Sequence, residues 1–332
     1  MRLASLWYGS HPLSILLAPL GWLFAMVATA RRYAYRAGLL HGERMPVPVI
    51  VVGNITVGGT GKTPLVIWLV EALRRAGRRP GVVSRGYGGE AASWPQTVDG
   101  DSDPRVVGDE PVLIACHCSC PVIVGPRRVQ AARKLLADHD CDVIVCDDGL
   151  QHYALARDME IAVIDGARRL GNGRCLPAGP LRERPSRLQS VDMVIVNGAA
   201  RAGEYTMELK GGEARALLDP DSVQSLERWR GESVHGMAGI GNPGRFFAHL
   251  REHGLRVVEH PFSDHHAFRP DELRFGDDLP VMMTEKDAVK CRGFALAGQW
   301  YVPVSAHLDE LCEQRLQRLL KRVLMRYGGE KA

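Results

Sequence analysis

A glycine-rich stretch near residue 60 contains the residue types that bind nucleotide phosphates, with one departure from the usual pattern. In the pattern G-x-x-x-x-G-K-[ST], counting back from Gly61, Lys62 and Thr63 places Thr56 where glycine is usual. The backbone N–H groups of such a loop bind phosphate oxygens, the lysine reaches the outer phosphates, and the hydroxyl binds Mg²⁺. Glycine at the first position only permits an unusual turn, so its loss is tolerable. We expect a nucleoside triphosphate to bind to Thr56, Val57, Gly58, Gly59, Thr60, Gly61, Lys62 and Thr63.

Two adjacent carboxylates offer the second half of a magnesium site. Asp147 and Asp148 directly follow a run of four apolar residues, 143–146. A carboxylate at the end of a buried strand beside a phosphate loop is typical of a Walker B element, which holds Mg²⁺ against the phosphates. Thr63, Asp147 and Asp148 are therefore the predicted metal ligands, and the sequence does not say which carboxylate binds the metal directly. The alternative is a polar turn that merely ends a strand.

Three further loops place acidic residues or histidines next to one another. They are "VGDEP" with Asp109, "DDGLQHY" with His152, and "FSDHHAF" with His265. An aspartate beside a histidine tunes a proton acceptor, whereas neighbouring polar residues in a loop are often only solvated. From spacing alone, both interpretations stay open for each loop.

A second glycine motif, Gly239 to Gly244, resembles a dinucleotide-binding turn because it lies between a predicted strand and a predicted helix. The match is weak. Pro243 removes a backbone N–H from the turn, and Glu259 comes early for the carboxylate that would bind a ribose. The alternative is an ordinary tight turn between a strand and a helix.

These residues require a sheet that brings several loops to one edge. From residue 45 onward, short runs of β-branched residues such as "PVIVVGN" alternate with amphipathic segments such as "PLVIWLVEALRRAG". Such alternation predicts an α/β fold with a mostly parallel sheet of the P-loop NTPase type, covered by helices on both faces. Ligands of such sheets bind at the carboxyl ends of the strands.

The chain of 332 residues is long enough for two domains, because single cores stop growing near ~250 to 300 residues. Residues 45–202 are predicted to form the nucleotide-binding domain. Residues 203–231 contain turn residues with weak periodicity and are predicted to be a linker. The alternation then restarts, so residues 232–332 are predicted to form a second, smaller α/β domain.

The N-terminal segment, residues 1–44, differs from the rest of the chain. Leu13 to Ala30 is a run of 18 residues without a charge, followed by three arginines within six residues. A membrane-spanning helix needs roughly 20 apolar residues, and Pro19 and Gly21 interrupt this run. The flanking aromatic residues and arginines favour a helix that lies on an anionic membrane surface. A buried core helix is the alternative, and a cleaved signal peptide is not indicated.

The overall composition excludes some classes of partner. The formal net charge is +4, and 35 of the 42 basic residues are arginine, the side chain that binds phosphates and carboxylates with a planar fork. The basic residues form no long block and no stripe interleaved with aromatics, so nucleic-acid binding is not indicated. The eight cysteines are typical of reduced intracellular thiols.

Taken together, the motifs resemble one known family. The strings "GNITVGGTGKTP", "VVSRGYGG", "VGDEP", "DDGLQH", "PAGPLRE", "GIGNPGRFF", "FSDHHAF" and "MTEKDA" occur in this order across residues 53–288. They resemble the tetraacyldisaccharide 4'-kinases, the lipid A 4'-kinases of Gram-negative bacteria. That family carries Ser or Thr at the position of Thr56, and its "GIGNPGRFF" landmark implies a structural turn rather than a dinucleotide site.

The resemblance implies an enzyme that transfers the γ-phosphate of ATP to the 4'-hydroxyl of a tetraacyldisaccharide 1-phosphate, with Mg²⁺. It would work at the cytoplasmic face of the bacterial inner membrane as a peripheral or monotopic protein. The alternative is a membrane-associated P-loop ATPase or nucleotide switch without a lipid acceptor. No oligomeric state is implied.

The resemblance also assigns roles to residues. It implies that Asp109 accepts the proton of the sugar hydroxyl, that His265 pairs with it, and that Lys62 holds the phosphates. Closure of two domains would be needed to bring Asp109 and His265 together. The catalytic set is completed by Asp147 and Asp148 with the metal. The residues expected to contact the sugar and its 1-phosphate are Arg85, Tyr87, Glu110, Gln151, His152, Arg182 and Glu183.

Overall fold

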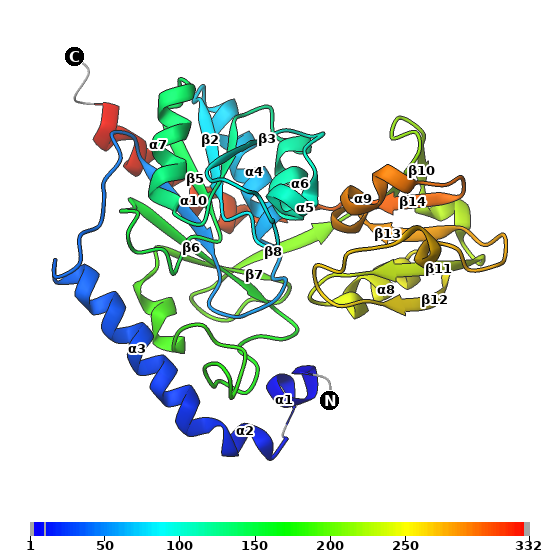
Figure 1. Ribbon diagram of the computed structural model, residues 1–332, viewed down its shortest axis with the longest axis horizontal. Helices are drawn as coiled ribbons and strands as arrows, with labels where there is room; N and C mark the ends of the chain where they lie inside the picture. The colour runs from blue at the N-terminus through cyan, green and yellow to red at the C-terminus, as the bar shows by residue number, and fades with distance from the viewer. Residues whose placement is uncertain (1–2, 10, 329–332) are drawn as a thin grey trace.

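The structure, a computed structural model, describes residues 3–9 and 11–328. These residues form a larger and a smaller α/β domain (Figure 1). The larger domain contains a nine-stranded sheet with the order β15-β8-β7-β6-β1-β5-β2-β4-β3. Its strands are β1 (Val49–Gly53), β2 (Pro80–Ser84), β3 (Gln96–Val98), β4 (Val122–Val124), β5 (Val143–Asp147), β6 (Met159–Asp165), β7 (Met193–Asn197), β8 (Tyr205–Lys210) and β15 (Ser305–Leu308).

The sheet is parallel except at its two edges, where β3 and β15 run antiparallel to their neighbours. Every residue of β1 and β5 is buried, as expected for β-branched strands that helices cover on both faces. The two strands are direct neighbours, and Val52 of β1 is paired with Asp147 of β5. The loops that follow these strands therefore meet at one edge of the sheet.

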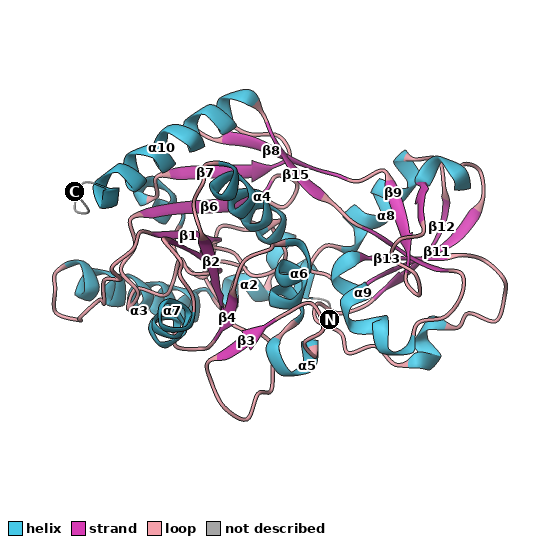
Figure 2. Cartoon of the chain, turned by 90° about the horizontal axis from the view of Figure 1, so that it is seen from above, coloured by secondary structure: helices cyan, strands magenta, loops and turns pink. Residues whose placement is uncertain are grey.

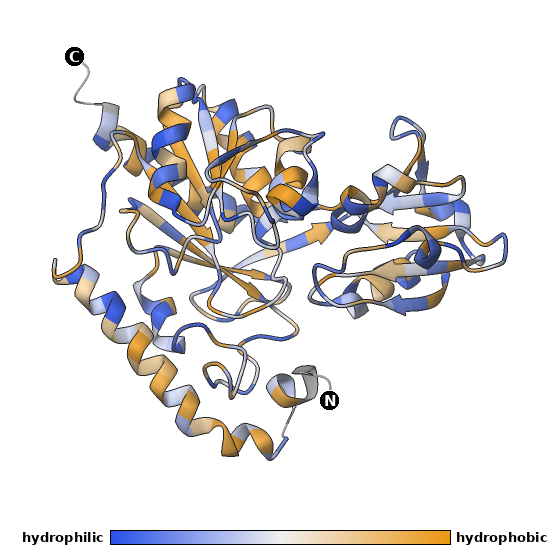
Figure 3. Cartoon of the chain, viewed as in Figure 1, coloured by the Kyte–Doolittle hydropathy of each residue, from blue (hydrophilic) through white to orange (hydrophobic). Residues whose placement is uncertain are grey.

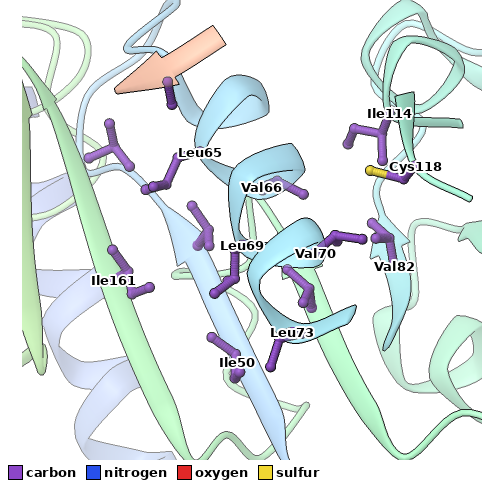
Figure 4. Packing of buried hydrophobic residues seen from close by; sticks show 14 of the residues in the cluster. Ile50, Leu65, Val66, Leu69, Val70, Leu73, Val82, Ile114, Cys118 and Ile161 are labelled. Carbon is purple, nitrogen blue, oxygen red and sulfur yellow. The ribbon is translucent and has the colours of Figure 1, made fainter. Parts of the chain in front are cut away.

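Helices cover both faces of the larger sheet. One face packs against α4 (Lys62–Arg75), α6 (Asp109–His117) and α10 (Glu310–Gly328), and the other against α7 (Arg128–Asp138). Figure 4 shows Leu65, Leu69 and Leu73 of α4, spaced one helical turn apart, packed against Ile50 of β1. Burying each of these leucines contributes ~1.5–3 kcal/mol. Shorter helical segments of the domain are α5 (Pro104–Val107) and η1 (Pro185–Ser190).

The smaller domain contains a six-stranded sheet with the order β10-β9-β14-β13-β11-β12. The strands are β9 (Glu213–Ala216), β10 (Val223–Ser225), β11 (Ser233–Ala238), β12 (Arg256–Pro261), β13 (Val281–Thr284) and β14 (Gln299–Val302). The helical segments are α8 (Pro243–Glu252), α9 (Glu285–Cys291), η2 (Leu226–Trp229), η3 (Pro270–Leu273) and η4 (Arg292–Phe294). Buried aromatic and methionine side chains on the two faces of this sheet form two separate hydrophobic clusters.

The domain boundaries differ from those expected. The stretch 203–231 is not a linker, because it contains β8 of the larger sheet and then β9, β10 and η2 of the smaller domain. Residues 305–328 were expected in the smaller domain, but β15 pairs with β8 and α10 packs on the larger sheet (Figure 2). The strands among these elements are short, so their hydrophobic periodicity is weak. Helix α10 has a clear apolar face, but nothing local says on which sheet that face packs.

Two short segments connect the domains, residues 211–212 and residues 303–304. They touch each other: a Cβ added to Gly211 would lie 2.3 Å from the carbonyl oxygen of Pro303. Only glycine permits this close approach of two backbones. The smaller domain is therefore an insertion between β8 and β15, and the two segments that connect it to the larger domain contact each other.

The N-terminal segment forms α1 (Leu3–Tyr8), α2 (Leu13–Leu16) and α3 (Ala18–Arg36). Helix α3 lies along the larger domain, on the side away from the smaller one (Figure 1), and packs through Ala18, Gly21 and Ala25. Much of the helix is coloured hydrophobic in Figure 3. Its apolar side chains on the outer face are exposed, with Trp22 at 66%. Helix α3 is thus not the buried core helix that was one alternative. Within residues 3–9 and 11–328, no helix combines the length and the apolar character that crossing a membrane requires.

Candidate active site

The phosphate loop lies between β1 and α4, as the motif predicts. Gly58 and Gly61 have φ of 94° and 92°, a left-handed conformation that glycine adopts without strain. Gly61 is also the N-cap residue of α4, and Lys62 begins the helix. Thr56 forms an isolated antiparallel bridge with Leu181 and is not among the residues with positive φ. An ordinary side chain is therefore allowed at Thr56, which explains the departure from the usual pattern.

Asp148 is held by two cations at the edge of the sheet. Its carboxylate lies 3.5 Å from Lys62 Nζ and accepts hydrogen bonds of 3.1 and 2.9 Å from Arg182 Nη1. Burial raises the pKa of Asp148, but the charges of Lys62 and Arg182 outweigh this and hold the pKa well below its ordinary value. Asp148 also has a positive φ of 48°, which is uncommon outside glycine and is often seen at functional sites.

Asp147 has the opposite environment. Its Oδ2 accepts a hydrogen bond of 2.9 Å from Ser84 Oγ, while its buried Oδ1 has no hydrogen-bond partner in the described structure. Burial, reinforced by the charge of Glu110, raises the pKa of Asp147 to about 7. A buried carboxylate oxygen without a partner fits Mg²⁺, which takes oxygen ligands and is usually bound by one or two carboxylates plus phosphates. The charge of Lys62, the first residue of α4, acts on Asp147, which places this carboxylate near the start of that helix.

Asp109 and His265 meet across the boundary between the domains. Asp109 begins α6 of the larger domain and is 4% exposed, and His265 lies in the loop that follows β12 of the smaller domain. The Nδ1 atom of His265 lies 3.1 Å from both carboxylate oxygens of Asp109. His265 has a positive φ of 59°, so the pairing holds a histidine in a strained backbone conformation.

Two lysines of α9 surround the same carboxylate. Lys286 Nζ and Lys290 Nζ each lie 3.9 Å from Asp109 Oδ2, and Lys286 also lies 3.0 Å from Glu110 Oε1. Burial raises the pKa of Asp109, but Lys286 and His265 outweigh it and lower the pKa to about 2. Burial lowers the pKa of His265, but its hydrogen bond to Asp109 outweighs this and raises the pKa above its ordinary value.

Neither lysine was predicted as a site residue. Both belong to the motif "MTEKDA" and its continuation, and their spacing of four places them on one face of α9. That spacing is the one feature of the sequence that indicates that the two lysines act on the same group. Its meaning depends on α9 lying against α6 across the domain boundary, which local sequence does not reveal (Figure 1).

The second glycine motif contacts the phosphate loop. A Cβ added to Gly241 would lie 2.4 Å from the backbone nitrogen of Gly59. Gly239 donates its N–H to Asp287 Oδ2 at 2.9 Å, and Arg245 pairs with Asp165 of the larger domain at 2.6 Å. The motif is thus a tight turn that positions the smaller domain over the loop, rather than a dinucleotide site.

Several of the predicted substrate contacts are bonded to other protein groups. Glu183 is 5% exposed and accepts hydrogen bonds from Gln151 Nε2 at 2.9 Å and Tyr153 Oη at 2.5 Å. Arg182 pairs with Asp148, as described above, and Glu110 pairs with Lys286. Four of the predicted substrate contacts thus bind other protein groups and hold the loops around the site in place; they are Glu110, Gln151, Arg182 and Glu183.

The remaining three predicted contacts lie around the Asp109–His265 pair and the start of α7. Tyr87 is exposed, and its ring centroid lies 4.9 Å from that of His265, with the Arg85 guanidinium 5.7 Å from the Tyr87 ring. His152 Nε2 accepts a hydrogen bond of 3.4 Å from the backbone nitrogen of Arg128. Burial, helped by the charge of Arg128, lowers the pKa of His152 to about 4, so it is a neutral group at physiological pH.

Comparison with known proteins places this arrangement in a family. A family model described as tetraacyldisaccharide-1-P 4'-kinase matches residues 13–323. Tetraacyldisaccharide 4'-kinases of Nitrosococcus oceani and Alkalilimnicola ehrlichii are 53% and 56% identical, over 91% and 92% of this chain and 89% and 92% of theirs. The crystal structure of LpxK from Aquifex aeolicus with ATP has a TM-score of 0.76 at 27% identity, covering 94% of this chain and 99% of that one. The chain therefore belongs to the tetraacyldisaccharide-1-phosphate 4'-kinase family.

Proposed function

We propose that the chain transfers the γ-phosphate of ATP to the 4'-hydroxyl of a tetraacyldisaccharide 1-phosphate, and that Asp109 and His265 form the centre of the site. The observation that carries this assignment is the ionised Asp109 carboxylate, which lies at the domain boundary with His265 and two lysines around it. The family membership supports an ATP-dependent kinase, a phosphotransferase of lipid A biosynthesis.

The phosphates of ATP lie along the loop that ends at Lys62 and Thr63. Lys62 approaches Asp148 to 3.5 Å, so its ammonium is positioned at the edge of the sheet where the outer phosphates would lie. Thr63 and Asp147 would hold Mg²⁺, because Asp147 retains a buried oxygen without a partner while Asp148 is already paired with two cations. When bound, Mg²⁺ would neutralise charge on the phosphate oxygens.

The base and ribose of ATP are proposed to occupy a cavity of about 750 Å³ beside the phosphate loop. Asn197 lines this cavity at the end of β7 and donates a hydrogen bond of 3.3 Å to the carbonyl oxygen of Thr60. The cavity lies on the side of β1 opposite to β5, so a nucleotide there would extend away from Asp147. Arg245 and His249 of α8 line the other wall, so the smaller domain contributes to the nucleotide site.

Asp109 is proposed to orient the 4'-hydroxyl and to accept its proton. A carboxylate with a pKa of about 2 is ionised at every physiological pH but is a weak base. Phosphoryl transfer proceeds through a loose transition state in most analyses, so positioning of the attacking oxygen matters more than early removal of its proton. The hydroxyl proton then moves to Asp109 as the new oxygen–phosphorus bond forms, while the bond between the γ-phosphorus and the bridging oxygen breaks and ADP leaves.

His265 and the lysines of α9 are proposed to fix that carboxylate. His265 donates its Nδ1–H to Asp109. Because the pKa of His265 is raised, a larger fraction of its rings is protonated at a given pH than for a free histidine. Because these groups come from the smaller domain, the arrangement is complete only when the two domains are in contact.

The lipid substrate requires a position at a membrane, and α3 is proposed to provide it. Its outer face exposes large apolar side chains, and arginines follow towards its C-terminal end. We assign the chain to the cytoplasmic face of the bacterial inner membrane, where ATP and the lipid disaccharide are both present. The exposed apolar face of α3 and the family membership support this assignment.

The test is to incubate the purified chain with ATP and Mg²⁺ in detergent micelles, with and without tetraacyldisaccharide 1-phosphate. The expected result is lipid that carries an added phosphate at the 4' position, with one ADP formed per product. Release of ADP at the same rate without the lipid, and with no phosphorylated lipid, would instead support a P-loop ATPase.

A further inference from the structure

A second polar cavity lies between the end of α3 and the larger domain. Its volume is about 240 Å³, and it is lined by side chains of α3, of η1 and of the segment that leads into β6. The residues important here are Arg32, Arg36, Tyr153, Arg157, Arg187 and Ser190. The cavity lies at the amino ends of β6 and β7, whereas the phosphate loop lies at the carboxyl ends of the strands, about 20 Å away along β6. It is therefore separate from the proposed nucleotide and sugar sites.

The carboxylates that line this cavity already have partners. Glu160 accepts hydrogen bonds of 2.6 Å from both Arg157 and Arg187. Asp158 pairs with Arg44 at 3.0 Å and accepts the N–H of Val49 at 3.0 Å. The third carboxylate, that of Asp192, accepts a hydrogen bond of 2.8 Å from the backbone N–H of Glu160. Glu160 and Asp158 thus have cationic partners outside α3, and Asp192 is exposed to solvent.

Arg32 and Arg36 have no such partners. Neither residue forms an ion pair within the described part of the chain, and the buried Nε of Arg32 has no hydrogen-bond partner there. Arg32 follows Ala25 by seven residues, as Ala25 follows Ala18, so it continues the face of α3 that packs on the domain. The cavity therefore contains at least one inward-facing guanidinium group with unused donors.

The surroundings of the cavity indicate where its ligand comes from. The outer face of the same helix exposes Trp22, Leu23 and Val27, and Tyr33 is exposed close to Arg32. Apolar side chains followed by tyrosine and arginine mark the level at which a surface helix meets lipid headgroups. A ligand that enters between α3 and η1 would thus come from the headgroup layer rather than from bulk solvent.

We propose that this cavity binds the phosphate of an anionic glycerophospholipid headgroup, through Arg32 and Arg36. Guanidinium groups bind phosphate oxygens with paired, charge-assisted hydrogen bonds, and four arginines in the wall outnumber three carboxylates. Such a site gives the chain a lipid contact that is independent of ATP and of the lipid disaccharide. It also adjoins Tyr153, whose hydroxyl donates to Glu183, so headgroup binding takes place next to the network that holds Gln151.

The test measures binding of a short-chain, soluble phosphatidylglycerol to the full chain by calorimetry, in the absence of ATP and lipid disaccharide. The variants Arg32→Gln and Arg36→Gln are each expected to weaken this binding by at least about tenfold, because each removes charge-assisted hydrogen bonds. The matched control is Arg31→Gln, an exposed arginine of the same helix that does not line the cavity, and it is expected to change the affinity less than about twofold. Unchanged melting temperatures of the variants would show that α3 is still in place.

Two results would overturn the proposal. The first is equal affinity of the Arg32→Gln, Arg36→Gln and Arg31→Gln variants, which would mean that general surface charge binds the lipid. The second is binding of inorganic phosphate as tight as that of the short-chain lipid, which would assign the cavity to a free anion. A zwitterionic short-chain phosphatidylcholine is expected to bind more weakly than phosphatidylglycerol. Because the assay contains no ATP, its failure would leave the proposed kinase activity untouched.

Discussion

His265 and Asp109 are 156 residues apart in the sequence, yet the Nδ1 atom of His265 lies 3.1 Å from both carboxylate oxygens of Asp109. One residue belongs to each domain, so the pair forms only where the domains touch. Burial of Asp109 at 4% exposure makes its charge costly unless a cation is near, and His265 and the lysines of α9 supply that cation.

Replacing Asp109 should separate nucleotide binding from transfer. We expect Asp109→Asn to lower the rate of lipid phosphorylation by about 10²- to 10⁴-fold, because the hydroxyl loses its proton acceptor, while the Kd for ATP changes less than about threefold. Product formation and ATP binding are measured by lipid chromatography and calorimetry. The control is Asp101→Asn, an exposed carboxylate of the same domain, which should leave both unchanged. Normal turnover by Asp109→Asn would remove Asp109 from the proposed role.

Stability of the nucleotide-free chain should depend on the protonation of Asp147. Its pKa is raised from about 4 to about 7, so the neutral form is favoured in the folded state. The stabilising contribution is present below about pH 4 and is lost as the pH rises towards 7. Asp147→Asn should therefore raise the melting temperature of the nucleotide-free chain above pH 7, and should abolish the stabilisation that Mg²⁺ adds in the presence of an ATP analogue.

The neighbouring residue provides the matched control for that experiment. The pKa of Asp148 is held below its ordinary value by Lys62 and Arg182, so Asp148→Asn removes a favourable charge and should lower the melting temperature at neutral pH. Scanning calorimetry on both variants shows whether their melting temperatures shift in opposite directions. Equal shifts of the same sign would contradict the different environments of the two carboxylates.

Removing Lys286 should change the pH profile of the reaction. Of the charges that lower the pKa of Asp109, the ammonium of Lys286 has the largest effect. Lys286→Met should therefore raise that pKa and move the acidic limb of the kcat/KM profile to higher pH. The profile of Lys321→Met, which changes an exposed lysine of α10, should overlay the parent profile. A lower rate with an unmoved acidic limb would show that Lys286 acts on something other than Asp109.

The close contact between the two glycine motifs predicts a defect from a single methyl group. Gly241→Ala would place its Cβ 2.4 Å from the backbone of Gly59, so the phosphate loop or the turn must shift. At about 1–3 kcal/mol for such overpacking, we expect ATP binding to weaken by about 5- to 150-fold. Gly244→Ala is the control, because the nearest atom lies 3.9 Å away and the residue is helical. Comparable affinities of the two variants would argue against the contact as a determinant of loop geometry.

The sequence alone predicts those parts of the fold that depend on residues close together in the chain. The β1–loop–α4 unit and the strand that ends at Asp147 follow from runs of buried residues, and both lie where the periodicity places them. Thr56 is explained only by the structure, because its bridge to Leu181 joins segments far apart in the chain.

Other features could not be predicted because they depend on contacts between the domains. Lys286 and Lys290 look like surface residues of a helix until α9 is placed against α6. The expected linker 203–231 was wrong because the short strand β8 shows weak alternation, and nothing local says that the edge strand β15 will return to pair with it. Glu183 was expected to touch substrate, a role that stays a prediction, and its burial under Gln151 and Tyr153 is a tertiary property.

The insertion of the smaller domain between β8 and β15 has a consequence for biosynthesis. A ribosome makes the whole smaller domain before it makes the edge strand and α10 that complete the larger sheet. A nascent chain that ends at Val302 already contains every residue proposed to take part in catalysis. It still lacks the helix that buries Leu316 and Leu320 against the larger domain, so an apolar surface stays uncovered until translation of the last segment. Completion of the nucleotide-binding domain thus has to wait for synthesis of the whole smaller domain.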